Sequence, residues 1–216
     1  MLTPRPYLSF SQMTKFEMSP EEYVRDYIYG QRFRPSKNML YGSALATGLE
    51  DGEATGDPLL DLMAARLPKL ERMDLPVEDP KGFEITFREG KTAKVPVLKT
   101  GNGSIPILAL PDTSTADYTA FKEYKTSVRK WTQKMADQSG QITFYATAIW
   151  LARGYIPKDI ELVNIQTAYD EYGGMTVTGE IYAYKTERTM VDVIKMTRRM
   201  KDAWAGIGKL CERELI

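Results

Sequence analysis

The strongest strand signals lie in residues 105–125, which read Ile-Pro-Ile-Leu-Ala-Leu-Pro-Asp-Thr-Ser-Thr-Ala-Asp-Tyr-Thr-Ala-Phe-Lys-Glu-Tyr-Lys. The apolar run Ile105–Leu110 predicts a buried strand, and Tyr118–Tyr124 predicts the next one. Val95–Leu98 predicts an earlier strand, which the turn residues Thr100–Gly103 would join to the first as a hairpin. Consecutive strands in mid-chain indicate that a β-sheet forms the centre of the fold.

Acidic and basic side chains lie at or just after the ends of these two predicted strands. If the two strands are neighbours, Asp112 and Glu123 lie side by side at one sheet edge, and Lys125 shares the face of Glu123. The two carboxylates would supply oxygen ligands for Mg²⁺ or Mn²⁺, and the Tyr124 carbonyl a further one. A lysine beside such a metal can hold a water molecule or a phosphate. A turn aspartate followed by a strand with a solvated Glu/Lys face fits the same residues, so both interpretations stay open.

Helical signals flank this centre. Ser19-Pro20-Glu21-Glu22 predicts a helix start that Ser19 caps, and the helix would end at Gly30. A long C-terminal helix is predicted from an apolar stripe at Val193, Met196, Met200, Ala203, Ile207 and Leu210. Further predicted helices are Lys37–Glu50, one opening at Asp57, and Asp137–Ala152; further strands are Phe83–Phe87, Glu161–Tyr169 and Met175–Tyr184, with 68–81 as a connector. We expect one α/β domain over residues 1–216, with a central mixed β-sheet flanked by helices.

The composition excludes several kinds of chemistry. The 216 residues contain no histidine, so Ser-His-Asp and Cys-His nucleophiles, histidine bases and HExxH zinc sites are ruled out. The single cysteine, Cys211, cannot form an internal disulfide, a cysteine-rich zinc site or an iron–sulfur cluster. We therefore expect no zinc, and any catalysis would use carboxylates, lysine, tyrosine, backbone groups and a metal. The formal net charge of zero argues against binding polyanions by global charge and leaves room for a local basic groove.

The chain carries no sign of membrane insertion or secretion. No stretch reaches the roughly 18 consecutive apolar residues that a membrane span needs, and residues 1–6 have no apolar signal core. We expect no membrane partner and a cytoplasmic location.

Three groups of motifs resemble a known family. Glu123-Tyr124-Lys125-Thr126, followed by a helix with Gln141-Ile142-Thr143-Phe144-Tyr145, resembles the closing motifs of RecB-like and lambda-exonuclease-like members of the PD-(D/E)XK nuclease superfamily, where a Q-x3-Y helix follows the lysine motif. Residues 7–13 with 19–23 look like that family's opening helix-turn, and residues 42–50 resemble its G-x-x-x-H-x-x-L-E helix. The matches run in the family's order from residue 7 to about residue 150.

This resemblance implies a restriction-endonuclease-like core and a metal-dependent deoxyribonuclease, an exonuclease rather than an endonuclease. Asp112, Glu123 and the Tyr124 carbonyl would hold one or two Mg²⁺ or Mn²⁺ ions, and Lys125 would position the attacking water. Gln141 and Tyr145, four apart on one helix face, would support the phosphate or the lysine. The implied partners are linear DNA ends and a single-strand annealing or recombination protein. A role in recombination or repair follows, in a host cytoplasm if the gene is phage-borne. A catalytically weakened DNA-binding or assembly subunit is the alternative.

The sequence departs from the family at two positions. Ala46 stands where the family has a metal-binding histidine, which implies weaker metal binding. Glu50, one turn later, would be either a third ligand or an ordinary glutamate at a helix C-terminus. Ser19 occupies the position of a cysteine in the iron–sulfur subset of the family, which agrees with the absence of a cluster.

Polar, basic and aromatic residues near the proposed site suit contacts to DNA phosphates and bases. The candidates are Ser9, Ser11, Arg32, Arg34, Lys122, Arg129, Lys130 and Trp131. Solvated loops around a core tryptophan would give the same pattern.

Overall fold

The computed structural model of the chain describes residues 3–31, 39–44, 56–66, 72–73, 75–87, 90–101 and 103–214. In that part of the chain, no helix combines the length and apolar character needed to cross a bilayer.

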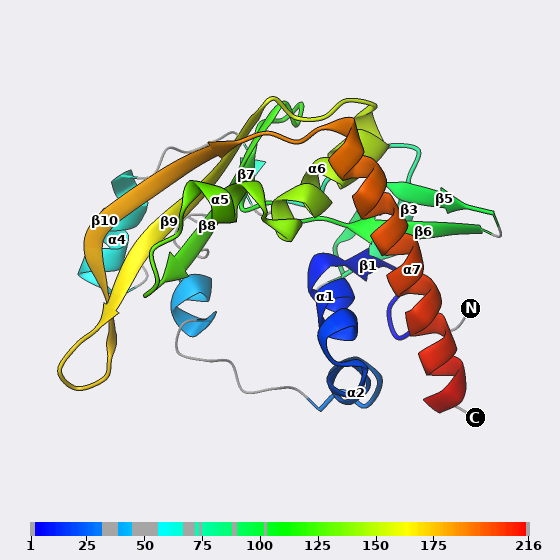
Figure 1. The fold of residues 1–216 in the computed structure, drawn as a ribbon, viewed down its shortest axis with the longest axis horizontal. Coiled ribbons are helices and arrows are strands. Elements are labelled where there is room, and N and C mark those ends of the chain that lie inside the picture. The colour runs from blue at the N-terminus through cyan, green and yellow to red at the C-terminus, as the bar shows by residue number, and fades with distance from the viewer. Residues whose placement is uncertain are drawn as a thin grey trace.

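A five-stranded mixed sheet with strand order β10-β9-β8-β7-β2 forms the centre of the described fold (Figure 1). Its long strands are β8 (Ala120–Ser127), β9 (Asp159–Tyr169) and β10 (Met175–Thr186), and its short ones are β7 (Thr113–Ser114) and β2 (Arg72–Met73). β8 and β9 run parallel, whereas the other neighbours are antiparallel. A parallel pair needs a crossover, and here it is made by α5 (Gln133–Asp137) and α6 (Gly140–Arg153).

Two smaller sheets adjoin this centre. One has strand order β1-β6-β5, with β1 (Leu8–Ser9) parallel to β6 (Gly103–Leu108) and β5 (Val97–Thr100) antiparallel to it. The other is the hairpin of β3 (Phe83–Thr86) and β4 (Thr92–Val95).

The remaining helices are α1 (Phe10–Met18), α2 (Pro20–Tyr23), the π-helical turn η1 (Val24–Ile28), α4 (Pro58–Arg66) and α7 (Met190–Glu214), and residues 39–44 are also helical. The predicted cap is present, since the Ser19 hydroxyl accepts a hydrogen bond from the Glu22 N–H at 3.2 Å. Ser9 caps α1 in the same way. Gly30, at φ +67°, lies where the helix was predicted to end.

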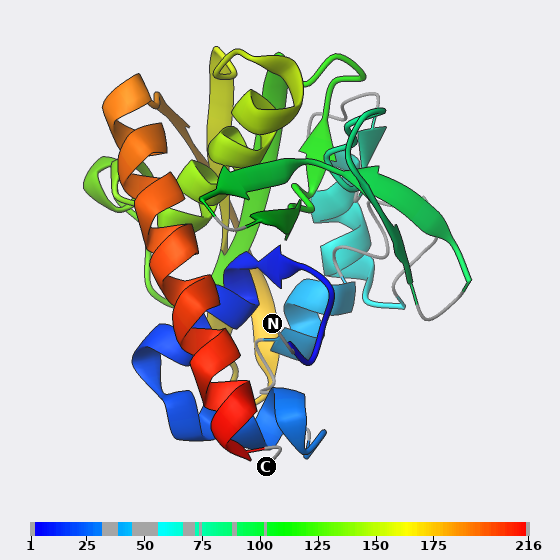
Figure 2. The ribbon, with the colours of Figure 1, turned by 90° about the vertical axis from the view of Figure 1, so that its right-hand side faces the viewer.

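Helices cover both faces of the central sheet. On one face, Ile142 and Phe144 of α6 join Phe121 of β8 in the main core, and α7 packs its predicted stripe against the same core (Figure 2). On the other face, Leu60 of α4 packs against Tyr124 and a cluster completed by Val163, Ile165 and Val177. Each large apolar side chain buried this way contributes about 1.5–3 kcal/mol, so β8 is held firmly between two layers.

The predicted α/β fold class is confirmed, and its assignment to a single domain stays a prediction. Five details were wrong. The predicted strand Val95–Leu98 is not one strand, because Val95 ends β4 and Val97 begins β5 in a different sheet. Ile105–Leu110 does not neighbour the 118–124 strand: β6 lies in another sheet, and β7 takes its place beside β8. That strand starts at Ala120, because Tyr118 occupies a turn at φ +60°.

The other two details concern the crossover helix and the connector. The predicted helix from Asp137 begins at Gly140, because Ser139 caps it by accepting from the Ile142 N–H, and the short α5 precedes it. The predicted connector at 68–81 contains β2, which is too short to produce a periodic pattern.

Candidate active site

The β7–β8 hairpin sets the position of the two predicted carboxylates. Thr113 pairs with Lys122 and Ser114 with Phe121, so the next step of the same register places Asp112 opposite Glu123. The Asp112 Oδ2 atom accepts a hydrogen bond of 2.6 Å from the Tyr124 N–H. The carboxylate thereby satisfies a backbone donor of β8 just before the start of β7, which fixes Asp112 beside Glu123.

Glu123 is the most unusual group of the site. Its residue is 2% exposed, and its Oε1 atom accepts a hydrogen bond of 2.5 Å from the Lys125 ammonium. Its other oxygen, Oε2, is buried without a hydrogen-bond partner among the described residues. Burial raises the pKa of Glu123 above its ordinary value, while Lys125 and Asp112 act in the opposite direction. A buried acceptor without a partner costs about 1–3 kcal/mol, so Oε2 is an unsatisfied atom in an otherwise hydrogen-bonded cluster.

Helix α6 supplies the second half of the cluster. The Gln141 Oε1 atom accepts a hydrogen bond of 2.8 Å from Lys125 Nζ, and Gln141 Nε2 donates one of 2.8 Å to the Tyr145 hydroxyl. The Tyr145 ring contacts Phe121 and Phe144 edge-on. The hydroxyl therefore holds the Gln141 amide with its oxygen turned towards the lysine. The structure brings together all five predicted catalytic residues, Asp112, Glu123, Lys125, Gln141 and Tyr145.

Two further residues that were predicted at the metal site, Ala46 and Glu50, lie outside the described residues. The helical residues 39–44 that lead towards them lie close to β8, since a Cβ atom on Gly42 would stand 3.2 Å from Thr126 Oγ1. The Tyr124 side chain is buried on the opposite face of β8 from Glu123. Within the described part of the chain, no three Asp, Glu, Cys or His side chains gather as a set of metal ligands.

The predicted DNA-contacting residues fall into separate places. Ser9 and Ser11 share a hydrogen bond of 3.1 Å at the start of α1. Arg32 and Arg34 lie outside the described residues. Lys122 points away from the cluster and forms an ion pair with Glu161 on β9.

The remaining three predicted DNA contacts follow β8 directly. Arg129 and Lys130 are exposed in the loop after the strand, and Lys130 Nζ lies 3.7 Å from the centre of the Tyr182 ring. Trp131 is partly buried against the main core. The DNA contacts of all these residues stay predictions.

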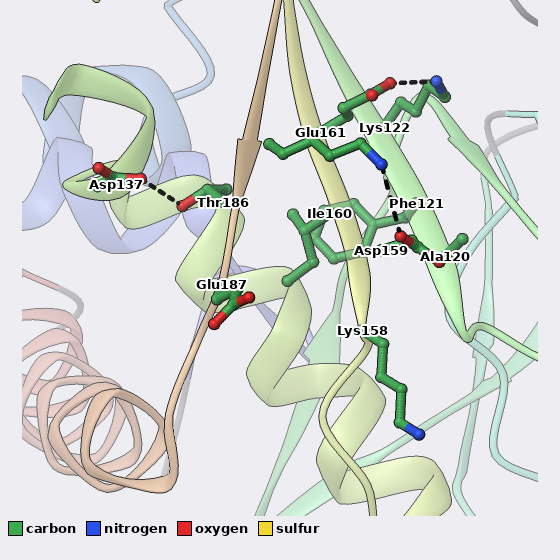
Figure 3. Close-up of a pocket in the computed structure, with 11 residues that line it drawn as sticks. Ala120, Phe121, Lys122, Asp137, Lys158, Asp159, Ile160, Glu161, Thr186 and Glu187 are labelled. Carbon is green, nitrogen blue, oxygen red and sulfur yellow. Dashed lines mark hydrogen bonds and ion pairs between the residues drawn. The ribbon is translucent and has the colours of Figure 1, made fainter. Parts of the chain in front are cut away.

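A cavity of about 810 Å³ opens at the beginning of β8 and β9 and the end of β10 (Figure 3). Most of its charges are balanced locally: Lys122 and Glu161 point at each other, and Lys185 lies 4.0 Å from Asp159. Asp112, Glu123 and Lys125 do not line it. The cavity is therefore separate from the cluster of Asp112, Glu123 and Lys125.

Sequence reasoning missed the residues that hold the loop after β8, above all Asn164 of β9. This residue is fully buried and bonds to the Lys125 carbonyl. Its only signal is a polar residue inside an apolar strand, Glu161–Tyr169, which by itself names no partner.

A central mixed sheet lies between helices, with Glu123 and Lys125 on its middle strand, Asp112 just before the neighbouring strand β7, and a long helix at the C-terminal end of the described chain. No protein-family profile and no curated protein sequence matches the chain. Among solved structures, a candidate exonuclease from Eubacterium rectale is similar with a TM-score of 0.51 at 12% identity, covering 95% of this chain and 82% of that one.

A second protein with a solved structure is the alkaline exonuclease LHK-Exo from Laribacter hongkongensis. Its structure with dAMP has a TM-score of 0.47 at 11% identity, and another structure of it has 0.43 at 10%. Each covers 98% of this chain and 95% of that one. At these identities the comparison with the Eubacterium rectale structure establishes a shared fold, consistent with the PD-(D/E)XK resemblance.

Proposed function

We propose that the protein is a metal-dependent deoxyribonuclease that hydrolyses phosphodiester bonds at the Asp112–Glu123–Lys125 cluster. The observation that carries this proposal is the buried Glu123 Oε2 atom, which has no hydrogen-bond partner among the described residues and lies on the residue opposite Asp112. A pair of adjacent carboxylates with a spare oxygen is poorly arranged for a purely structural role, because like charges repel and the buried oxygen is unsatisfied.

The donor set fits a hard divalent cation. Carboxylate oxygens are the preferred ligands of Mg²⁺ and Mn²⁺, and Asp112 and Glu123 would hold one or two such ions, with the Tyr124 carbonyl and Glu50 as further proposed ligands. The ion would supply Lewis-acid stabilisation of phosphate charge and activation of a bound water.

The chain's own residues orient the substrate. Lys125 has three N–H donors, and two of them are directed at Glu123 and Gln141. Its third donor has no partner among the described residues and would serve a phosphate oxygen or the attacking water. The Tyr145–Gln141 pair fixes the direction of that donor, because it holds the amide oxygen that Lys125 contacts. Such preorganised charge is a main source of catalysis.

The finer proposal is an exonuclease that acts on linear DNA ends in recombination or repair, with a single-strand annealing or recombination protein as partner. A phage or mobile-element origin, with Mg²⁺ or Mn²⁺ as cofactor, belongs to the same proposal. The support is the resemblance of the motifs to the PD-(D/E)XK family and the shared fold; the step from fold to role is analogy.

One observation favours a second candidate, a nuclease-fold DNA-binding or assembly subunit with weakened catalysis. The described residues gather only two acidic ligands at the site, and Ala46 stands where the family has a histidine. A missing ligand lowers metal affinity and would leave DNA binding intact.

Hydrolysis of linear and covalently closed circular DNA, single- and double-stranded, with Mg²⁺, Mn²⁺ or EDTA, separates these candidates. The parent, Lys125→Ala and Ala46→His are compared. Metal-dependent loss of linear DNA alone, abolished by Lys125→Ala, supports the exonuclease. No cleavage by the parent, together with cleavage by Ala46→His, supports a weakened nuclease. No cleavage by any of the three proteins, with DNA still bound, contradicts the nuclease proposal.

A further inference from the structure

Asn164 connects the candidate catalytic lysine to the loop that follows it. It lies on β9 directly opposite Lys125 on the parallel strand β8, and it is fully buried. Its Nδ2 group donates to the Lys125 carbonyl at 3.1 Å and to Ser127 Oγ at 3.0 Å, while its Oδ1 atom accepts from the Trp131 N–H at 3.1 Å. The Lys125 carbonyl can only accept and the Trp131 N–H can only donate, so these partners fix the orientation of the amide.

The same loop, residues 127–131, is anchored at several further points. Ser127 Oγ donates to the Arg129 carbonyl at 2.6 Å, and the Tyr184 hydroxyl of β10 donates to the Trp131 carbonyl at 2.5 Å. Gln166 of β9 donates to the Val128 carbonyl. The backbone groups of exposed loops usually form hydrogen bonds with water. In the 127–131 loop, side chains of β9 and β10 form hydrogen bonds with several of them instead.

The anchored loop presents cations to solvent directly after the strand that carries Lys125. Val128, Arg129 and Lys130 are exposed, and Lys130 lies over the Tyr182 ring. Cationic side chains on a fixed backbone bind phosphates with a smaller entropy cost than the same side chains on a mobile loop.

We propose that Asn164 is a positioning residue that fixes the 127–131 loop, a contact surface for the phosphodiester backbone of DNA, relative to Lys125. This inference rests on the proposed nuclease function. Without the Asn164 amide, the Lys125 carbonyl and the Trp131 N–H lose their common partner, and the loop cations no longer keep a set distance from the lysine. A displacement of about 1 Å in such a constellation costs up to about 100-fold in rate.

Asn164→Ala tests the proposal, with Thr186→Val as the matched control. Thr186 is also a buried polar residue of the central sheet, and its hydroxyl bonds to Asp137 and Arg188, away from Lys125 and the loop. Cleavage of linear DNA gives kcat and KM, fluorescence anisotropy in EDTA gives DNA affinity, and the thermal midpoint reports folding. We expect Asn164→Ala to lose at least about 10-fold in kcat and about 5-fold in metal-free affinity, while Thr186→Val lowers only the midpoint.

Ser127→Ala keeps the test decisive if Asn164→Ala does not fold. It removes the hydroxyl shared by Asn164 and Arg129 at a half-buried position, and we expect a smaller loss of affinity, about 3-fold. Folded variants with kcat and affinity within twofold of the parent, or equal losses in the control, overturn the inference. A parent that binds but does not cleave DNA overturns the proposed function instead, and the EDTA affinities of the variants then decide the inference alone.

Discussion

Two lysine–glutamate ion pairs involve strand β8, and they differ in position, exposure and surroundings. Lys125 and Glu123 are two residues apart on one strand face, and the Glu123 side chain is only 3% exposed. Lys122 and Glu161 are register partners across β8 and β9, at 15% and 18% exposure. The first pair adjoins Asp112 and Gln141; the second lines the cavity of Figure 3.

This difference separates the pair that we propose to be catalytic from a pair with a structural role. The Lys122–Glu161 pair joins two strands and leaves no buried oxygen without a partner. At Glu123 one oxygen has no partner among the described residues, the pKa is raised by burial, and the lysine is oriented by a glutamine–tyrosine pair. A buried carboxylate with a raised pKa and an unpartnered oxygen atom supports the proposal of a functional site at Glu123.

The largest expected effect comes from removing one carboxylate of each pair. Glu123→Gln should lower metal-dependent DNA hydrolysis by at least about 100-fold, because it replaces the carboxylate, both the proposed metal ligand and the anionic partner of Lys125, with a neutral amide. Glu161→Gln, the matched change, should leave the rate within about twofold. Steady-state cleavage assays at saturating metal measure both, and equal losses in the two variants would contradict the distinction.

A smaller effect is expected at Tyr145, the last residue of the hydrogen-bonded relay that runs from Lys125 through Gln141 to the Tyr145 hydroxyl. Tyr145→Phe keeps the ring contacts to Phe121 and Phe144 but removes the hydroxyl that orients Gln141. The loss of one neutral hydrogen bond, about 1 kcal/mol, predicts a fall in kcat of about fivefold. Thr147→Val, which removes another hydroxyl of α6, serves as the control and should not change kcat. If Tyr145→Phe turned over at the parent rate, the relay would have no part in catalysis.

The smallest effect is a pH dependence of stability. Because burial raises the pKa of Glu123 above 4.5 in the folded state, the protein loses stability as pH rises through that raised pKa. Glutamine does not titrate, so the melting temperature of metal-free Glu123→Gln should rise relative to that of the parent as the pH increases above 4.5, the ordinary pKa of a glutamate. Calorimetric scans across this range measure the gap, with Glu180→Gln, an exposed site, as the control. A difference in melting temperature that stays constant or narrows as the pH rises would contradict the raised pKa of the buried Glu123 carboxylate.

Four members of the cluster could be predicted because short-range periodicities relate them in pairs. Glu123 and Lys125 share a face through the two-residue period of a strand, and Gln141 and Tyr145 share one through the helical turn. The partner of β8 could not be predicted, because Ile105–Leu110 shows a strand but not its sheet, and β7 is only two residues long.

The loop anchors were missed for a related reason. Asn164, Gln166 and Tyr184 reach the 127–131 loop from β9 and β10, more than 30 residues further along the chain. Their role depends on strand order and register, which a single sequence does not encode locally.

The central claim is that Asp112 and Glu123 form a divalent-cation site, and direct Mn²⁺ binding tests it without reference to turnover. Titration calorimetry of the parent, Glu123→Gln and Glu161→Gln with Mn²⁺ would compare the two ion pairs of β8. The account predicts saturable binding in the parent and in Glu161→Gln, and its loss in Glu123→Gln. Binding of equal strength in all three proteins, or none in the parent, would contradict it.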